Sequence, residues 1–103
     1  MILNETVEDE MESLPADVRA RFYRIVELIT EFGLNNVGMP HVRHLQGKLW
    51  EMRMKGKDGI SRALYVVATR KRVVVVRAFV KKTQKTPNRE IKIAIERAKE
   101  IEE

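Results

Sequence analysis

The chain has 103 residues, 44% of them hydrophobic and 34% charged, and it lacks cysteine, which excludes disulfides, thiolate zinc sites and cysteine nucleophiles. No apolar run approaches the roughly 18 residues of a membrane span, and the acidic start MILNETVEDEME lacks the parts of an export signal, so we expect one soluble, cytoplasmic domain. The net charge of +5 is uneven, because residues 35–89 hold 14 basic and 2 acidic side chains, residues 1–34 hold 3 and 8, and residues 90–103 hold 3 and 5.

The N-terminal third predicts two helices. Residues 1–3 can add a short strand, and Asn4 or Thr6 can cap a brief acidic helix that runs to about Ser13. A second, amphipathic helix is expected from Pro15 to Phe32, followed by a helix-ending glycine, Gly33. Its apolar stripe repeats at spacings of three and four residues and consists of Val18, Phe22, Ile25, Ile29 and Phe32.

The central segment changes to a period of two, which predicts antiparallel strands. In residues 49–54 one face holds Trp50, Met52 and Met54, and the other holds Glu51 and Arg53. Turn residues at 55–59 lead to a second strand at residues 60–68. A third strand over residues 73–80 begins with four valines, and we expect it to lie centrally in the sheet with both faces covered.

The C-terminal segment predicts a closing helix. Thr86 can cap it with Pro87 at its first position, and its apolar stripe is Ile91, Ala94, Ile95 and Ala98. The predicted fold class is α+β, in which two N-terminal helices pack on a curved three- to four-stranded antiparallel sheet that is followed by a C-terminal helix. We expect residues 1–103 to form a single domain.

Three segments carry a family resemblance: LQGKLWEMR at 45–53, RALY at 62–65 and FVKKTQKTP at 79–87. In their residues, order and spacing they resemble the phage-derived, HigB-like branch of the RelE/ParE toxins. The resemblance implies a RelE-like fold whose helices cover one side of the sheet, while the other, basic side engages messenger RNA in the ribosomal decoding site. It therefore implies a type II toxin, a ribosome-dependent mRNA endoribonuclease whose partners are the ribosome, the message and a cognate helix-turn-helix antitoxin.

Cleavage of RNA by its own 2′-hydroxyl requires loss of a proton, stabilisation of the phosphorane charge and protonation of the leaving oxygen. Lysine and arginine can stabilise that charge, and a lysine crowded by cations has a lowered pKa that suits proton transfer. By resemblance, Arg62 matches the arginine at the scissile phosphate. The catalytic candidates are Arg62, Arg53, Lys82 and Lys85. The alternative for Arg62 is a surface arginine or a partner of Glu51, and the alternative for Arg53 is a structural contact of Glu51 and Arg53 with neighbouring strands. For the lysines the alternative is a solvated loop.

A basic centre of this kind also favours a polyanion partner, although such charge can be mere solvated surface. The RNA-binding candidates are Lys81, Arg77, Lys48, Lys55 and Lys57. Many relatives, by resemblance, carry histidine where this chain has Arg77, and arginine is a poor proton shuttle.

The two histidines and two of the aromatic residues suggest further roles that we rank lower. His41 and His44 lie in a segment that is expected to be a loop and lacks other ligands, so we predict no metal site and no cofactor. Trp50 and Tyr65 can stack on bases, but their apolar neighbours favour core packing.

Two other functions remain open from the sequence. One is a ParE-like inhibitor of DNA gyrase, because ParE shares the fold. The other is a degenerate module that only binds its antitoxin, which the missing histidine favours.

Overall fold

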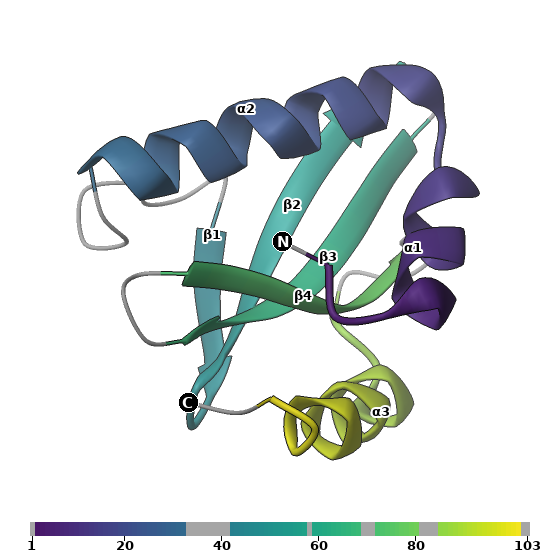
Figure 1. Cartoon of the computed structure of the whole chain (residues 1–103). Coiled ribbons are helices and arrows are strands. Elements are labelled where there is room, and N and C mark those ends of the chain that lie inside the picture. The colour runs from purple at the N-terminus through teal and green to yellow at the C-terminus, as the bar shows by residue number, and fades with distance from the viewer. Residues whose placement is uncertain (1, 33–41, 58, 69–71, 81–84, 102–103) are drawn as a thin grey trace.

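The computed structural model describes residues 2–32, 42–57, 59–68, 72–80 and 85–101. In chain order, these residues form α1 (Glu5–Glu12), α2 (Ala16–Phe32), β1 (Val42–Gln46), β2 (Leu49–Gly56), β3 (Gly59–Ala68), β4 (Arg72–Val80) and α3 (Asn88–Ala98) (Figure 1). The predicted α+β architecture is confirmed, with four strands in one antiparallel sheet. None of the described helices is long and apolar enough to span a membrane.

The two N-terminal helices form where the sequence predicts them. Asn4 caps α1, because its side chain accepts a hydrogen bond from the Val7 amide at 3.1 Å. The four apolar residues at the centre of the α2 stripe, from Val18 to Ile29, are buried. Phe32, the fifth member of the predicted stripe, is 52% exposed, so that part of the prediction is wrong. Gly33 lies outside the described residues.

The sheet has the order β1-β2-β3-β4, so β4 is an edge strand and not the central strand that its valines predicted. The valines reflect burial on both faces: Val73 and Val75 face one apolar core, and Val74 and Val76 face the other. The free edge is partly covered, because the Leu3 amide donates to the Val75 carbonyl at 3.1 Å and Ile2 forms a parallel bridge to Val75.

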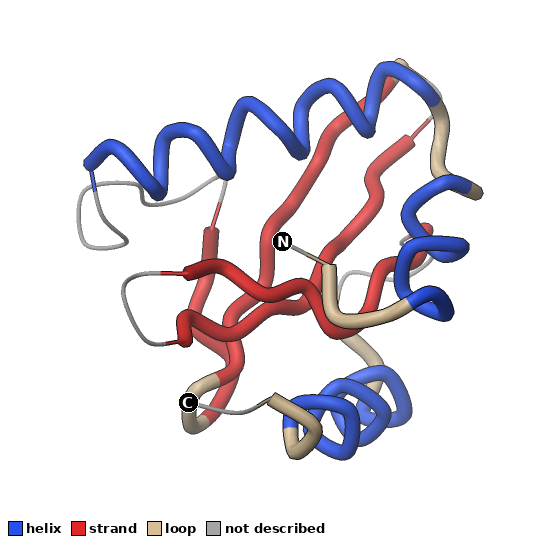
Figure 2. Tube along the Cα trace, in the orientation of Figure 1, coloured by secondary structure: helices blue, strands red, loops and turns tan. Residues whose placement is uncertain are grey.

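The sheet has helices on both of its faces. The helices α1 and α2 cover the face that carries Met52, Met54 and Tyr65. The helix α3 lies on the opposite face of the sheet (Figure 2). There Ala94 packs with residues such as Leu64. The expectation that the helices cover one side of the sheet is therefore wrong, and among the described helices α3 covers only part of the second face.

The approach to α3 also differs from the prediction. Thr86 does not cap the helix; the N-cap is Pro87, without a side-chain cap bond, and the helix begins at Asn88. Thr86 is instead buried and turned towards the sheet, where its hydroxyl bonds to side chains of β2 and β3. The predicted apolar stripe of α3 is confirmed, since Ala94 is buried and Ile91, Ile95 and Ala98 pack against the same core.

Candidate nucleic-acid interface

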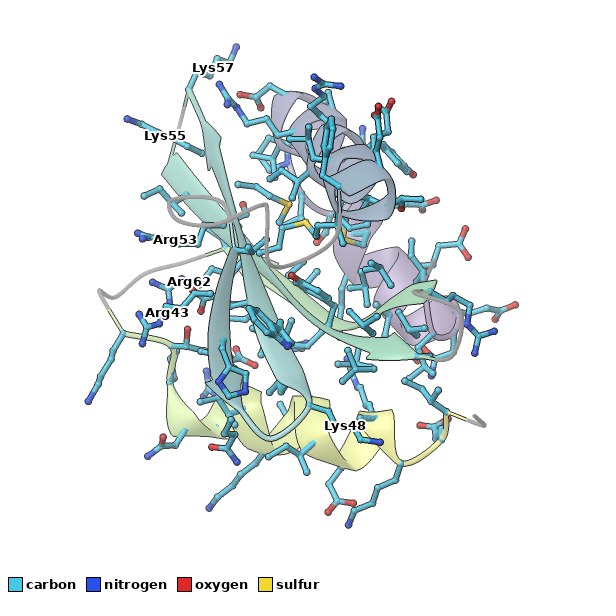
Figure 3. All side chains as sticks on the ribbon, turned by 90° about the vertical axis from the view of Figure 1, so that its left-hand side faces the viewer. Arg43, Lys48, Arg53, Lys55, Lys57 and Arg62 are labelled. Carbon is cyan, nitrogen blue, oxygen red and sulfur yellow. The ribbon has the colours of Figure 1, made fainter. Side chains whose placement is uncertain are left out.

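Three arginines meet on the open part of the second sheet face. Arg53 of β2 lies directly opposite Arg62 of β3, and Arg43 of β1 lies opposite Glu51 of β2. Glu51 and Arg53 share a face because they are two residues apart in one strand. Figure 3 shows Arg43, Arg53 and Arg62 gathered on one side of the molecule. We call these three residues the arginine cluster.

The buried base of the cluster is an ion pair. The Arg62 Nη1 atom lies 3.0 Å from the Glu51 Oε2 atom, and the two side chains are 1% and 0% exposed. The Thr86 hydroxyl joins them, because it accepts a hydrogen bond from Arg62 and donates one to Glu51. This arrangement ties β2, β3 and the segment before α3 together. It is the structural contact that the sequence left as the alternative for Arg62.

The electrostatics of the cluster follow from its burial and its neighbours. Burial lowers the pKa of the Arg62 guanidinium, the Glu51 carboxylate opposes that shift, and the charges of Arg53 and Arg43 lower the pKa further. Arginine remains charged in spite of this. One carboxylate thus faces three guanidinium groups, and the cluster keeps an excess positive charge that favours an anion.

Two further predicted cations extend the arginine cluster along β2. Lys55 and Lys57 are exposed and lie beyond Arg53 towards the turn between β2 and β3 (Figure 3). Lys48 does not join them. It sits in the turn between β1 and β2, at the other end of the strand, and lines a small pocket with Ile95 and Ala98 of α3.

Arg77 belongs to a different network. Its Nε atom lies 2.8 Å from Glu90 Oε1, and its Nη1 atom lies 2.6 Å from Glu10 Oε2. Arg97 of α3 also contacts Glu10, at 2.9 Å. The hydrogen bond to Glu90 raises the pKa of Arg77, and Glu10 adds to this effect against the opposing desolvation. Because two carboxylates hold Arg77 between α1 and α3, we leave it out of the RNA surface.

Three of the predicted site residues are lysines that follow β4: Lys81, Lys82 and Lys85. Lys81 and Lys82 lie outside the described residues. Lys85 is described and exposed, and it precedes Thr86, whose hydroxyl contacts the base of the arginine cluster. Lys85 therefore lies beside the cluster, and its catalytic role stays a prediction.

The histidine and aromatic candidates that the structure describes make contacts within the fold. His44 lies in β1 and not in a loop; its Nε2 atom is 2.8 Å from the Gly47 carbonyl oxygen, and its ring meets Trp50 edge-on with centroids 5.1 Å apart. Tyr65 is fully buried, and burial raises the pKa of its hydroxyl. His41 lies outside the described residues. Among those that are described, no group of three acidic, histidine or cysteine side chains is arranged to hold a metal.

Sequence reasoning missed two members of the site. Arg43 was not singled out, because β1 buries only Val42 fully and forms by pairing with β2. Thr86 was assigned to a helix cap. The register that places Arg43 opposite Glu51 is known only from the structure, and no local sequence pattern places the Thr86 hydroxyl against β2 and β3.

Comparisons with known proteins agree with this architecture. Residues 9–99 match the family model described as phage-derived protein Gp49-like. A solved structure of the E. coli toxin RelE, a double arginine-to-alanine mutant in the free state, superimposes with a TM-score of 0.56 at 19% sequence identity, covering 91% of this chain and 90% of that one. No curated protein matches the sequence significantly.

Proposed function

The chain belongs to the phage-derived Gp49-like family, and from this membership and the RelE-like fold we propose that it is a toxin that cleaves messenger RNA on the ribosome. In this proposal it acts in the cytoplasm, and a cognate helix-turn-helix antitoxin neutralises it. The family and the fold support a toxin of a toxin–antitoxin pair. The arginine cluster supports RNA as the target.

The observation that carries the proposal is the pairing of Arg53 with Arg62. Like charges directly opposite each other in a sheet are destabilising, and Glu51 supplies a single carboxylate for the three guanidinium groups. A fold keeps such an arrangement at the expense of stability, which is typical of a functional site. A phosphate bound between Arg43 and Arg53 relieves the repulsion.

The cluster suits the charge that develops when RNA cleaves itself. The 2′-oxygen attacks the adjacent phosphorus and releases its proton to a base, the bond from phosphorus to the 5′-oxygen breaks, and that oxygen takes up a proton. We assign phosphate binding to Arg43 and Arg53, whose guanidinium groups stabilise the phosphorane. Lys82 and Lys85 are the candidates for proton transfer.

Arg62 takes a more restricted part in this scheme. Because it is 1% exposed and bonded to Glu51 and Thr86, direct contact with a phosphate requires the Thr86 hydroxyl to give way. We therefore propose that Arg62 is a positioning residue, which keeps positive potential behind Arg53 and anchors β3 to β2. Its catalytic role, as the resemblance implies it, stays a prediction.

The test is primer extension on a defined message in a purified translation system, with and without ribosomes. Arg53→Ala should reduce cleavage by about 10²–10³-fold, as expected for loss of a group that stabilises transition-state charge. Lys92→Ala, at an exposed position of α3, removes the same charge and should leave cleavage unchanged. Intact messages in every lane would overturn the proposal, and DNA damage signalling in that case would favour gyrase inhibition.

A degenerate module that only binds its antitoxin is the second candidate. It is favoured by the burial of Arg62, by the commitment of Arg77 to Glu10 and Glu90, and by the absence of histidine from the described part of the cluster. Tight antitoxin binding without toxicity or cleavage would establish it.

A further inference from the structure

A basic groove lies between α2 and the hairpin formed by β2 and β3. It has a volume of about 670 Å³ and is lined by Asp17, Ala20, Arg21 and Arg24 of α2 and by Lys55, Gly56 and Lys57 of the hairpin. Its four cations come from both walls and are all exposed. Figure 3 shows Lys55 and Lys57 at the end of the hairpin beside α2. Neither Arg21 nor Arg24 has a part in the site described above.

Two contacts hold the walls of the groove in place. A side chain on Gly56 would bring a Cβ atom within 2.7 Å of Val18 Cγ2, so the glycine allows β2 to approach α2 closely. The Lys57 amide donates a hydrogen bond to Asp17 Oδ2 at 2.9 Å, and this bond lowers the pKa of Asp17. Asp17 thus fixes the turn to the first part of α2. The groove is preformed, which reduces the ordering cost of binding.

The lining identifies the chemistry of the ligand. Among the described residues, four cations face one carboxylate and none of the four forms an ion pair, so an anion is favoured. The described lining of the groove includes no aromatic side chain for base stacking. Contacts from lysine and arginine without stacking are those that bind a sugar–phosphate backbone without reading its sequence.

The groove also continues the arginine cluster. Lys55 follows Arg53 on the same strand face at a distance of about 7 Å, the rise of two strand residues, and Lys57 stands at the mouth of the groove. We propose that the groove binds the backbone of the same RNA strand whose scissile phosphate lies at the arginine cluster, with Arg21 and Arg24 as its outer wall. This inference rests on the proposed function for its choice of RNA.

The experiment measures binding apart from cleavage. Wild-type protein and an Arg21→Ala/Arg24→Ala variant are titrated into a fluorescently labelled single-stranded RNA without ribosomes, over a range of salt concentrations. The slope of log K against log salt, where K is the association constant, is negative, and loss of two phosphate contacts should reduce its magnitude by about 1.4. At about 0.1 M salt this corresponds to binding that is about 25-fold weaker. Both substitutions are at exposed helix positions where alanine is favourable, and thermal unfolding verifies the fold.

The control is Lys92→Ala/Lys99→Ala, which removes the same charge from exposed positions away from the groove, one in α3 and one at its C-cap, where Lys99 pairs with Glu96 at 3.1 Å. Retained affinity in the control with the loss in the groove variant supports the inference. Equal losses in both variants, or no loss in the groove variant, overturn it. Polyglutamate is titrated in the same way. If it binds to the wild type as tightly as RNA and loses its affinity in the groove variant, the inference is also overturned, because the occupant of the groove would then be an acidic protein. RNA binding is measured here without ribosomes and independently of cleavage. Absence of cleavage in the primer-extension assay would therefore refute the proposed function but would not decide whether the groove binds RNA.

Discussion

The buried ion pair between Glu51 and Arg62 allows the most direct test of the site's architecture. Its two charged atoms are 3.0 Å apart. At an effective dielectric constant of about 20, two unit charges at that distance attract each other by about 5 kcal/mol. We expect Glu51→Leu to lower the free energy of unfolding by about 3–5 kcal/mol, because it leaves a buried guanidinium without its counter-charge. That is a large fraction of the roughly 5–15 kcal/mol that stabilises a small domain.

A double-mutant cycle separates the pair from the cost of each truncation. Glu51→Leu, Arg62→Met and the double variant are unfolded in urea and followed by circular dichroism, with the m-value checked for two-state behaviour. The double variant should be less destabilised than the sum of the two singles, because neither charge is then left buried alone. Glu51→Gln, which preserves the shape, covers the case in which Glu51→Leu does not fold. Additive costs below about 1 kcal/mol each would refute a buried, coupled pair.

Three other changes test neighbouring features. Arg53→Thr should raise the free energy of unfolding by about 0.2–1 kcal/mol by removing the like charge opposite β3, while single-stranded RNA binding weakens; a loss in urea stability would contradict the repulsion argument. Gly56→Ala should cost about 1–3 kcal/mol by forcing α2 and β2 apart, and an unchanged melting temperature would show that the approach is not tight. The pKa of Asp17 is lowered in the folded state by the amide bond from Lys57, so its contribution is present above its ordinary value of 3.8 and is lost as the pH falls through the folded value. The difference in free energy of unfolding between wild type and Asp17→Asn should therefore disappear in acid. A difference that grows in acid would show that the folded state does not lower the pKa of Asp17.

The fold was largely predictable because periodicity is a local property. The stripe of α2 and the alternation of β2 each bury one face, and the sequence displays those faces directly. The error over β4 has a physical cause: a continuous valine run reports burial on two faces, and here α3 covers the second face of an edge strand. Burial pattern alone cannot distinguish such an edge from a central strand.

The candidate site was predictable only where charge and strand alternation coincide. Arg53 was found because it alternates with buried methionines on β2. Arg43 was missed because β1 is defined by its partner strand, and Thr86 because its hydroxyl meets Glu51 across 35 residues of sequence. Contacts at such separations leave no local pattern, so they required the structure.

The positions of the carboxylates distinguish the functional cations from the structural ones. Arg77 and Arg97 share Glu10, and Glu90 completes the neutralisation of Arg77, so these cations hold α1 and α3 against β4. Sequence ranked Arg77 with the RNA-binding residues because Glu10 lies 67 positions away along the chain. By contrast, six cations from the arginine cluster to the basic groove, of which Arg53 is half-buried and the others are exposed, form no ion pair within the described residues: Arg43, Arg53, Lys55, Lys57, Arg21 and Arg24. A cation that already has a carboxylate gains little from a phosphate, whereas an unpaired cation releases counterions when it binds one. These six residues should therefore contribute to the salt dependence of RNA binding, and Arg77 should not.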